Sequence, residues 1–197
     1  MATQKELVAV VAKEMGIPIE TVTVIDRYLA EAGLRTRAAR GRGNTPMTYQ
    51  DAANLIIATA WEVNPKDAVN LVEVFASLPA YRVKETVSVA GDALGSTFGE
   101  ALAAAIEVVP RHKREFSLGD DKPEHMSFTV KMYRNWLDES AEILLVKEQR
   151  HHTFQYERPF EIRKGTDKIV RDLRRTAEFS QITLGFVGEA IADGFSR

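Results

Sequence analysis

The chain of 197 residues contains no cysteine. This absence excludes disulfide bonds, thiolate metal ligands and cysteine nucleophiles, and it fits a reducing cytoplasm, where we expect the protein to act. Long apolar runs are missing as well, and no stretch approaches the roughly 20 residues that a membrane-spanning helix needs. The N-terminal residues Met-Ala-Thr-Gln-Lys-Glu have neither the apolar core nor the cleavage pattern of a secretory signal. We therefore expect no membrane partner.

The chain as a whole also lacks the positive charge that is common in nucleic-acid-binding proteins, because its formal net charge is −2. The charge is distributed unevenly. Residues 1–50 carry seven Lys/Arg and five Asp/Glu, a balance of +2, which leaves 19 and 23, a balance of −4, for residues 51–197. Between Ala32 and Gln50 there are four arginines and no acidic residue. Because charge acts over about a Debye length, roughly 8–10 Å, this local excess decides which partner the segment attracts.

The beginning of the chain is predicted to be mostly helical. Apolar residues recur at helical spacing over residues 4–15 and 20–32. The residues between them, Gly16-Ile17-Pro18, are typical of a break between two helices. Residues 35–47 are rich in Arg, Gly, Asn and Pro, and we expect no helix there. We therefore predict two helices followed by an irregular segment.

Two further helices are predicted before the composition changes. Thr48 and Asp51 have the spacing of a capping box at the start of an apolar helix. Asn64-Pro65 is typical of another helix start, with proline at the first helical position. We place a linker after this helix, around residues 79–83, and predict a first domain over residues 1–78.

The second part of the chain, residues 83–197, contains both helical and β-favouring segments. Residues 126–133 alternate apolar and polar side chains, which is typical of a strand with one buried face. Further β-favouring runs follow, so we predict an antiparallel sheet and the fold class α+β: a mostly helical domain followed by an α+β domain. The remaining predicted strands are residues 143–146, 153–156 and 175–182, and the predicted helices are residues 97–109, residues 167–175 and a last helix that starts at Thr183.

The two N-terminal helices have the residue pattern of a helix-turn-helix. This motif needs a small residue where the helices meet, a glycine four positions later at a turn with positive φ, and apolar residues along the inner face of the second helix. The series Ala12, Gly16, Ile17, Val22 and Ile25 supplies these residues in order. The same series would also suit any pair of helices joined by a tight turn.

The outer face of the second helix is where a helix-turn-helix reads DNA bases. Helical spacing places Thr21, Thr23, Arg27 and Tyr28 on that face, and their side chains are able to reach base edges in the major groove. Two acidic residues of the same helix carry the wrong charge for contact with phosphates, so we expect the affinity to come from elsewhere. These acidic residues are Glu20 and Asp26.

Arginines that follow this helix supply the missing positive charge. Arg35, Arg37, Arg40 and Arg42, together with Asn44, lie where a winged helix places its wing. Guanidinium groups at such a position pair with phosphates or enter the minor groove. Four phosphate contacts would give a salt slope of about −3.6, at roughly −0.9 per contact. Without that context, an arginine-rich segment is more often a solvated loop.

The stretch Ala12–Leu55 resembles the winged-helix DNA-binding domain of the MerR family of regulators. The motifs that carry the resemblance are Ile25-Asp26-Arg27-Tyr28, Glu31-Ala32-Gly33-Leu34, Arg40-Gly41-Arg42-Gly43 and Met47-Thr48-Tyr49-Gln50-Asp51. The resemblance covers about a quarter of the chain and implies a winged helix-turn-helix over residues 4–60. Excisionases and small terminase subunits of phages and mobile elements use a similar module. The effector-binding cysteines of metal-sensing relatives are missing, so metal sensing is not implied.

No other part of the sequence predicts an enzyme, a cofactor or a metal site. Neighbouring residues of a strand point to opposite faces, so we interpret His151-His152 as polar surface. We interpret Asp120-Asp121, near His125, as a loop. The aromatic residues of the second part could line a pocket or stack on bases, but packing in a core or an oligomer is the safer interpretation. They are Phe128, Trp136, Phe154, Tyr156 and Phe160.

These observations predict a sequence-specific regulator of transcription that binds double-stranded DNA. The resemblance implies a phage or another mobile element as its source. We expect a homodimer or a larger homo-oligomer, with residues 83–197 free to hold a protein partner. Two alternatives stay open: a packaging or recombination factor of the small-terminase type, which a ring of eight or more subunits would favour, and a protein-binding inhibitor or adaptor whose first domain controls its own gene.

Overall fold

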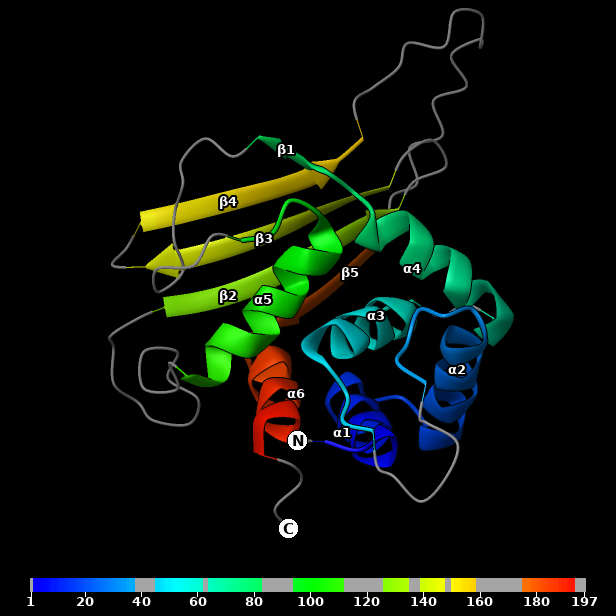
Figure 1. Cartoon of the computed structure of the whole chain (residues 1–197). Coiled ribbons are helices and arrows are strands. Elements are labelled where there is room, and N and C mark those ends of the chain that lie inside the picture. The colour runs from blue at the N-terminus through cyan, green and yellow to red at the C-terminus, as the bar shows by residue number, and fades with distance from the viewer. Residues whose placement is uncertain are drawn as a thin grey trace, which may run out of the picture.

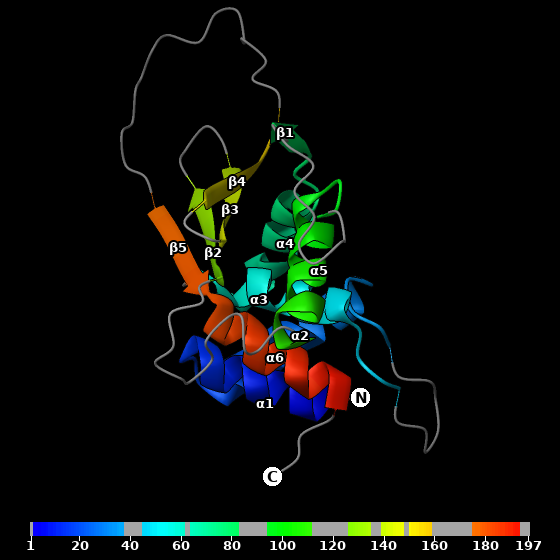
Figure 2. The same cartoon turned by 90° about the vertical axis from the view of Figure 1, so that its left-hand side faces the viewer.

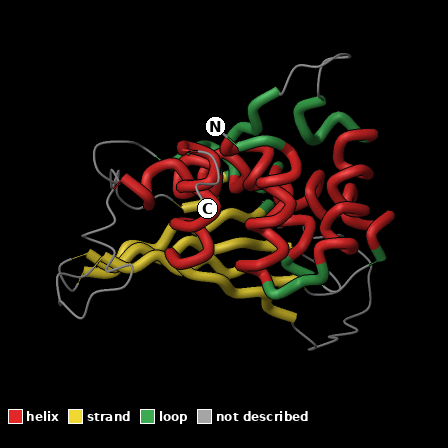
Figure 3. Tube along the Cα trace, turned by 90° about the horizontal axis from the view of Figure 1, so that it is seen from below, coloured by secondary structure: helices red, strands yellow, loops and turns green. Residues whose placement is uncertain are grey.

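A computed structural model of the chain places its helices on one side of an antiparallel sheet (Figures 1 and 3). The described residues are 2–37, 45–61, 64–82, 94–111, 126–134, 139–147, 150–158 and 175–193. Within these ranges there are six α-helices, one short 3₁₀ helix and five strands. None of the helices in the described ranges has the length and apolar character needed to cross a membrane. The predicted α+β class with an antiparallel sheet is confirmed.

The first four helices are α1 (Gln4–Met15), α2 (Ile19–Glu31), α3 (Tyr49–Thr59) and α4 (Ala68–Ala76), with a 3₁₀ turn, Pro65–Asp67, before α4. Reciprocal hydrogen bonds cap two of them. Thr3 and Glu6 form a capping box at α1, and the predicted capping box of Thr48 and Asp51 is present at α3. These caps satisfy amide groups that a helix start leaves without a partner, so the helices begin where the sequence predicts.

The sheet has the strand order β1-β4-β3-β2-β5, with antiparallel neighbours throughout. Alternation decides which side chains enter the core. Phe128, Val130 and Met132 are buried, and they lie opposite buried residues of the next strand. The bounds are β1 Ala80–Arg82, β2 Met126–Arg134, β3 Glu139–Lys147, β4 Arg150–Glu157 and β5 Arg175–Ser180.

Two helices from the second half of the chain, α5 (Phe98–Arg111) and α6 (Gln181–Asp193), connect the sheet to the N-terminal helices. α5 packs on α3, and α6 runs beside α1 (Figure 2). The helices α5 and α6 approach closely at Gly188, where an added Cβ would lie 2.1 Å from the carbonyl oxygen of Ile106. Buried side chains from both halves form one continuous core. The predicted boundary at residues 79–83 therefore does not separate two hydrophobic cores.

Some segments differ from the predicted ones. Residues 80–82, placed in a linker, form β1 because they pair with β4. The last helix begins at Gln181 instead of Thr183, and the Gln181 side chain accepts a hydrogen bond of 3.2 Å from the Phe128 amide of β2. Of the predicted helix over residues 167–175, only Arg175 is described, and it begins β5 instead. The predicted loop at Asp120-Asp121 lies outside the described residues.

Candidate nucleic-acid interface

The helices α1 and α2 are joined by the tight turn that their sequence predicts. Gly16 has a φ of 67°, in the left-handed region, and the next amide, of Ile17, donates a hydrogen bond of 2.9 Å to the carbonyl of Ala12. Ala12, Val22 and Ile25 are buried where the two helices pack. The predicted inner face of α2 therefore belongs to the core, and the opposite face is left at the surface.

Two of the four residues predicted to read bases lie exposed on that outer face of α2, and the other two lie at its borders. Thr23 and Arg27 are exposed, whereas Thr21 and Tyr28 are half-buried. The hydroxyl of Thr23 donates a hydrogen bond of 2.7 Å to the carbonyl of Ile19. The guanidinium of Arg27 lies 5.5 Å from the centre of the Tyr28 ring. This arrangement presents a hydroxyl, a cation and an aromatic ring together on one helix surface.

Only one of the two acidic residues expected to oppose phosphate contact lies on this surface. Glu20 is exposed, but Asp26 points inward and is fully buried. The outer face of α2 therefore carries less negative charge than the number of acidic residues in this helix suggests. Arg27 lies 3.8 Å from Glu31 one turn later, and both side chains are largely exposed, so this pair restrains Arg27 only weakly.

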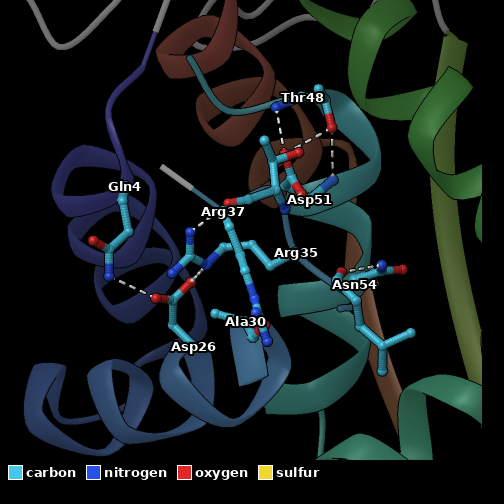
Figure 4. A network of polar contacts seen from close by, with 10 residues as sticks. Gln4, Asp26, Ala30, Arg35, Arg37, Thr48, Asp51 and Asn54 are labelled. Carbon is cyan, nitrogen blue, oxygen red and sulfur yellow. Dashed lines mark hydrogen bonds and ion pairs between the residues drawn. The ribbon is translucent and has the colours of Figure 1, made fainter. Parts of the chain in front are cut away.

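The buried carboxylate of Asp26 contacts Arg35, the first of the predicted wing arginines (Figure 4). The Arg35 Nε and Asp26 Oδ1 atoms are 2.8 Å apart, and the Arg35 side chain is only 9% exposed. The other carboxylate oxygen of Asp26, Oδ2, accepts a hydrogen bond of 2.6 Å from the side-chain Nε2 of Gln4. Burial raises the pKa of Asp26 above its ordinary value, while Arg35 and Gln4 act in the opposite direction. Because Arg35 is paired inside the protein, its side chain is not placed to contact a phosphate, in contrast to the prediction.

A second buried carboxylate, that of Asp51 in α3, holds the next residue of the chain (Figure 4). Its Oδ1 atom accepts a hydrogen bond of 2.7 Å from the Thr36 amide. Its Oδ2 atom accepts hydrogen bonds of 2.8 Å from both the amide and the hydroxyl of Thr48. Asp51 therefore caps α3 and also binds the chain that leaves α2.

Arg37 is exposed and lies at the C-terminal end of α2. Its Nε donates a hydrogen bond of 2.7 Å to the carbonyl of Ala30, and its Nη2 donates one of 2.8 Å to the carbonyl of Glu31. A cation at this end of a helix is stabilised by the helix dipole and by hydrogen bonds to the last carbonyl groups. Arg37 thus brings its charge to the C-terminal end of α2. The other predicted wing residues, Arg40, Arg42 and Asn44, lie outside the described residues.

The pair of Asp26 with Arg35 was not found from the sequence, although a signal was present. Position 26 follows Val22 by four residues and precedes Leu29 by three, and both of those side chains are buried. Helical spacing therefore places Asp26 on the inner face, where a carboxylate needs a partner. The first cation after the helix, Arg35, was the available candidate.

The remaining candidates of the sequence lie away from this surface. His151 is exposed and His152 is half-buried on β4, and no group of three possible metal ligands occurs in the described part of the chain. Phe128, Phe154 and Tyr156 belong to the core, in agreement with the packing interpretation. Residues outside the described ranges are Asp120, Asp121, His125, Trp136 and Phe160.

Comparison of the chain with protein-family models, curated proteins and solved structures gives no match.

Proposed function

We propose that this protein is a sequence-specific regulator of transcription that binds double-stranded DNA, with α1, α2 and the following segment as a winged helix-turn-helix. The observation that carries the proposal is the position of Arg37. Its guanidinium lies on the last carbonyls of α2, at the end of the helix on which Thr23 and Arg27 are exposed. A base-reading face and an adjoining cation are the two parts that recognition of duplex DNA requires.

In this proposal the contacts divide into two kinds. The outer face of α2 enters the major groove, where Arg27 pairs with the edge of a guanine and Thr21 and Thr23 contact neighbouring bases. Tyr28, beside Arg27, supports its orientation. The phosphate contacts come from Arg37 and from three residues of the following segment, Arg40, Arg42 and Asn44.

We further propose a homodimer that binds two half-sites, because one α2 offers only a small base-reading surface. The resemblance to MerR regulators, excisionases and small terminase subunits supports a phage or another mobile element as the setting. The mass of the protein in solution, with and without duplex, tests the dimer. A ring of eight or more subunits would contradict the dimer and favour a packaging factor.

Selection of bound duplexes from a random pool at moderate salt tests the proposed function most directly. We expect a recurring sequence to be enriched. The variant T21V/R27Q should lose preference for that sequence by about 1–3 kcal/mol per base contact while its affinity for unrelated duplexes is kept. Absence of enrichment, or an equal loss on every sequence, would contradict base reading by α2.

The arginine segment has its own test. The variant R40A/R42A should bind all duplexes more weakly, and the slope of log affinity against log salt should fall by about two units. The matched control is R175A, which removes an exposed arginine from β5 and should leave the slope unchanged. If the slope of R40A/R42A is also unchanged, these arginines make no phosphate contact.

A further inference from the structure

Two buried carboxylates bind neighbouring residues of the chain that leaves α2. Asp26 in α2 contacts the Arg35 guanidinium, and Asp51 in α3 accepts the Thr36 amide hydrogen bond (Figure 4). The chain is thus fixed from both sides immediately before Arg37, whose side chain lies on the carbonyls of α2. Three consecutive residues therefore have defined partners on two different helices.

A buried ion pair such as that of Asp26 and Arg35 is not expected to stabilise a protein more than apolar residues would. Removing two charges from water is costly, and apolar residues of similar volume often stabilise a core equally well or better. A guanidinium, however, has a fixed planar shape and several donors. The Arg35 guanidinium forms an ion pair with Asp26, and its Nη1 donates a hydrogen bond of 2.6 Å to the carbonyl of Thr36. The side chain therefore fixes the backbone next to it, which an apolar side chain does not do.

We propose that Asp26 and Arg35 are positioning residues that hold residues 34–37 in the conformation that places Arg37 beside the base-reading face of α2. This inference rests on the proposed function for its consequence in DNA binding. Neither positioning residue contacts DNA, because Asp26 is fully buried and the Arg35 side chain is 9% exposed. They act through the path of the chain, and Gln4 of α1 contributes by binding the second oxygen of Asp26.

The variant D26L/R35M separates positioning from stability. It removes the ion pair, keeps the net charge and leaves apolar side chains in the core. We expect its unfolding temperature to stay close to that of the wild type. The Thr36 amide should exchange its hydrogen about tenfold faster, because the chain around it loses its support. Affinity for the duplex selected with the wild type should fall about five- to tenfold, with a smaller preference over unrelated duplexes.

The matched control is K131M/E178L, which removes an ion pair of 3.5 Å on β2 and β5 and also keeps the net charge. Neither the Thr36 exchange rate nor the duplex affinity should change in this control. A second variant, R35K, keeps the positive charge but lacks the planar guanidinium. It should remain folded even if D26L/R35M does not, and it should show a faster Thr36 exchange together with a weaker duplex affinity.

Each result supports or overturns the inference. A folded D26L/R35M protein with wild-type exchange at Thr36 and wild-type affinity would overturn it, as would faster exchange with unchanged affinity. If D26L/R35M does not fold, an R35K protein that matches the wild type in both measurements overturns it equally. If the wild type itself enriches no duplex, the proposed function fails together with the role in DNA binding. The exchange rate still decides in that case whether the pair fixes residues 34–37.

Discussion

The helical part of this protein contains a buried ion pair, whereas an ion pair of its sheet lies at the surface. In the helical part, Asp26 and Arg35 form a contact inside the protein, with exposed side-chain fractions of 0% and 9%. In the sheet, Lys131 and Glu178 form a contact of 3.5 Å at the surface, with fractions of 34% and 55%. The lesson is that similar contacts have different consequences: water screens the surface pair, whereas each charge of the buried pair depends on the other.

Breaking the buried pair on one side should have the largest effect on stability. The variant R35A leaves the Asp26 carboxylate buried without its cation, and we expect the free energy of unfolding to fall by about 3–5 kcal/mol. Denaturation in urea measures this change. The comparison would be weakened if R35A cost no more than a typical surface substitution, about 0.5 kcal/mol.

Loss of the second buried carboxylate, that of Asp51, should have the next largest effect on stability. D51A removes the cap of α3 and leaves the Thr36 amide without its partner, so we expect a loss of about 2–3 kcal/mol. D51N retains part of the hydrogen bonding and should cost less. The same denaturation experiment compares the two variants. Equal losses would show that charge, and not hydrogen bonding, accounts for the effect.

The pH dependence of stability should reveal the buried acid. Burial raises the pKa of folded Asp26 above its ordinary value of 3.8. Between these two pKa values the folded protein binds more protons than the unfolded chain, so the contribution of Asp26 to stability falls as the pH rises through this window. Unfolding of the wild type and of D26N, measured in steps from about pH 4 to pH 7, isolates this contribution. We expect the free energy of unfolding of the wild type to fall relative to that of D26N as the pH rises. If it rises instead, the attraction of Arg35 outweighs the cost of burial.

The surface pair of the sheet should give the smallest effect. K131M removes its cation from an exposed contact, and we expect a loss below about 1 kcal/mol that decreases further at high salt. Denaturation at two salt concentrations measures it. A larger and salt-independent loss would mean that the sheet and the helical part do not differ in the way proposed.

Local rules predicted much of the fold. The break at Gly16 and the cap at Thr48 are interactions between residues close in the chain, and the structure contains both. The alternation over residues 126–133 predicted a strand and its buried face in the same way. β1 was missed because its partner, β4, lies some seventy residues later, and pairing over that separation leaves no local pattern.

Of the candidate interface, the sequence by itself determined the outer face of α2, because helical spacing fixes which side chains lie opposite the core. Only the tertiary structure decided the roles of the arginines. Arg35 and Arg37 are two positions apart and have the same chemistry, yet one is buried against Asp26 and the other lies exposed at the end of α2. The difference depends on how the chain turns back onto α2, where Asp51 of α3 holds Thr36 between the two arginines. That path places Arg35 against a buried carboxylate of α2 and Arg37 against the last carbonyls of the same helix.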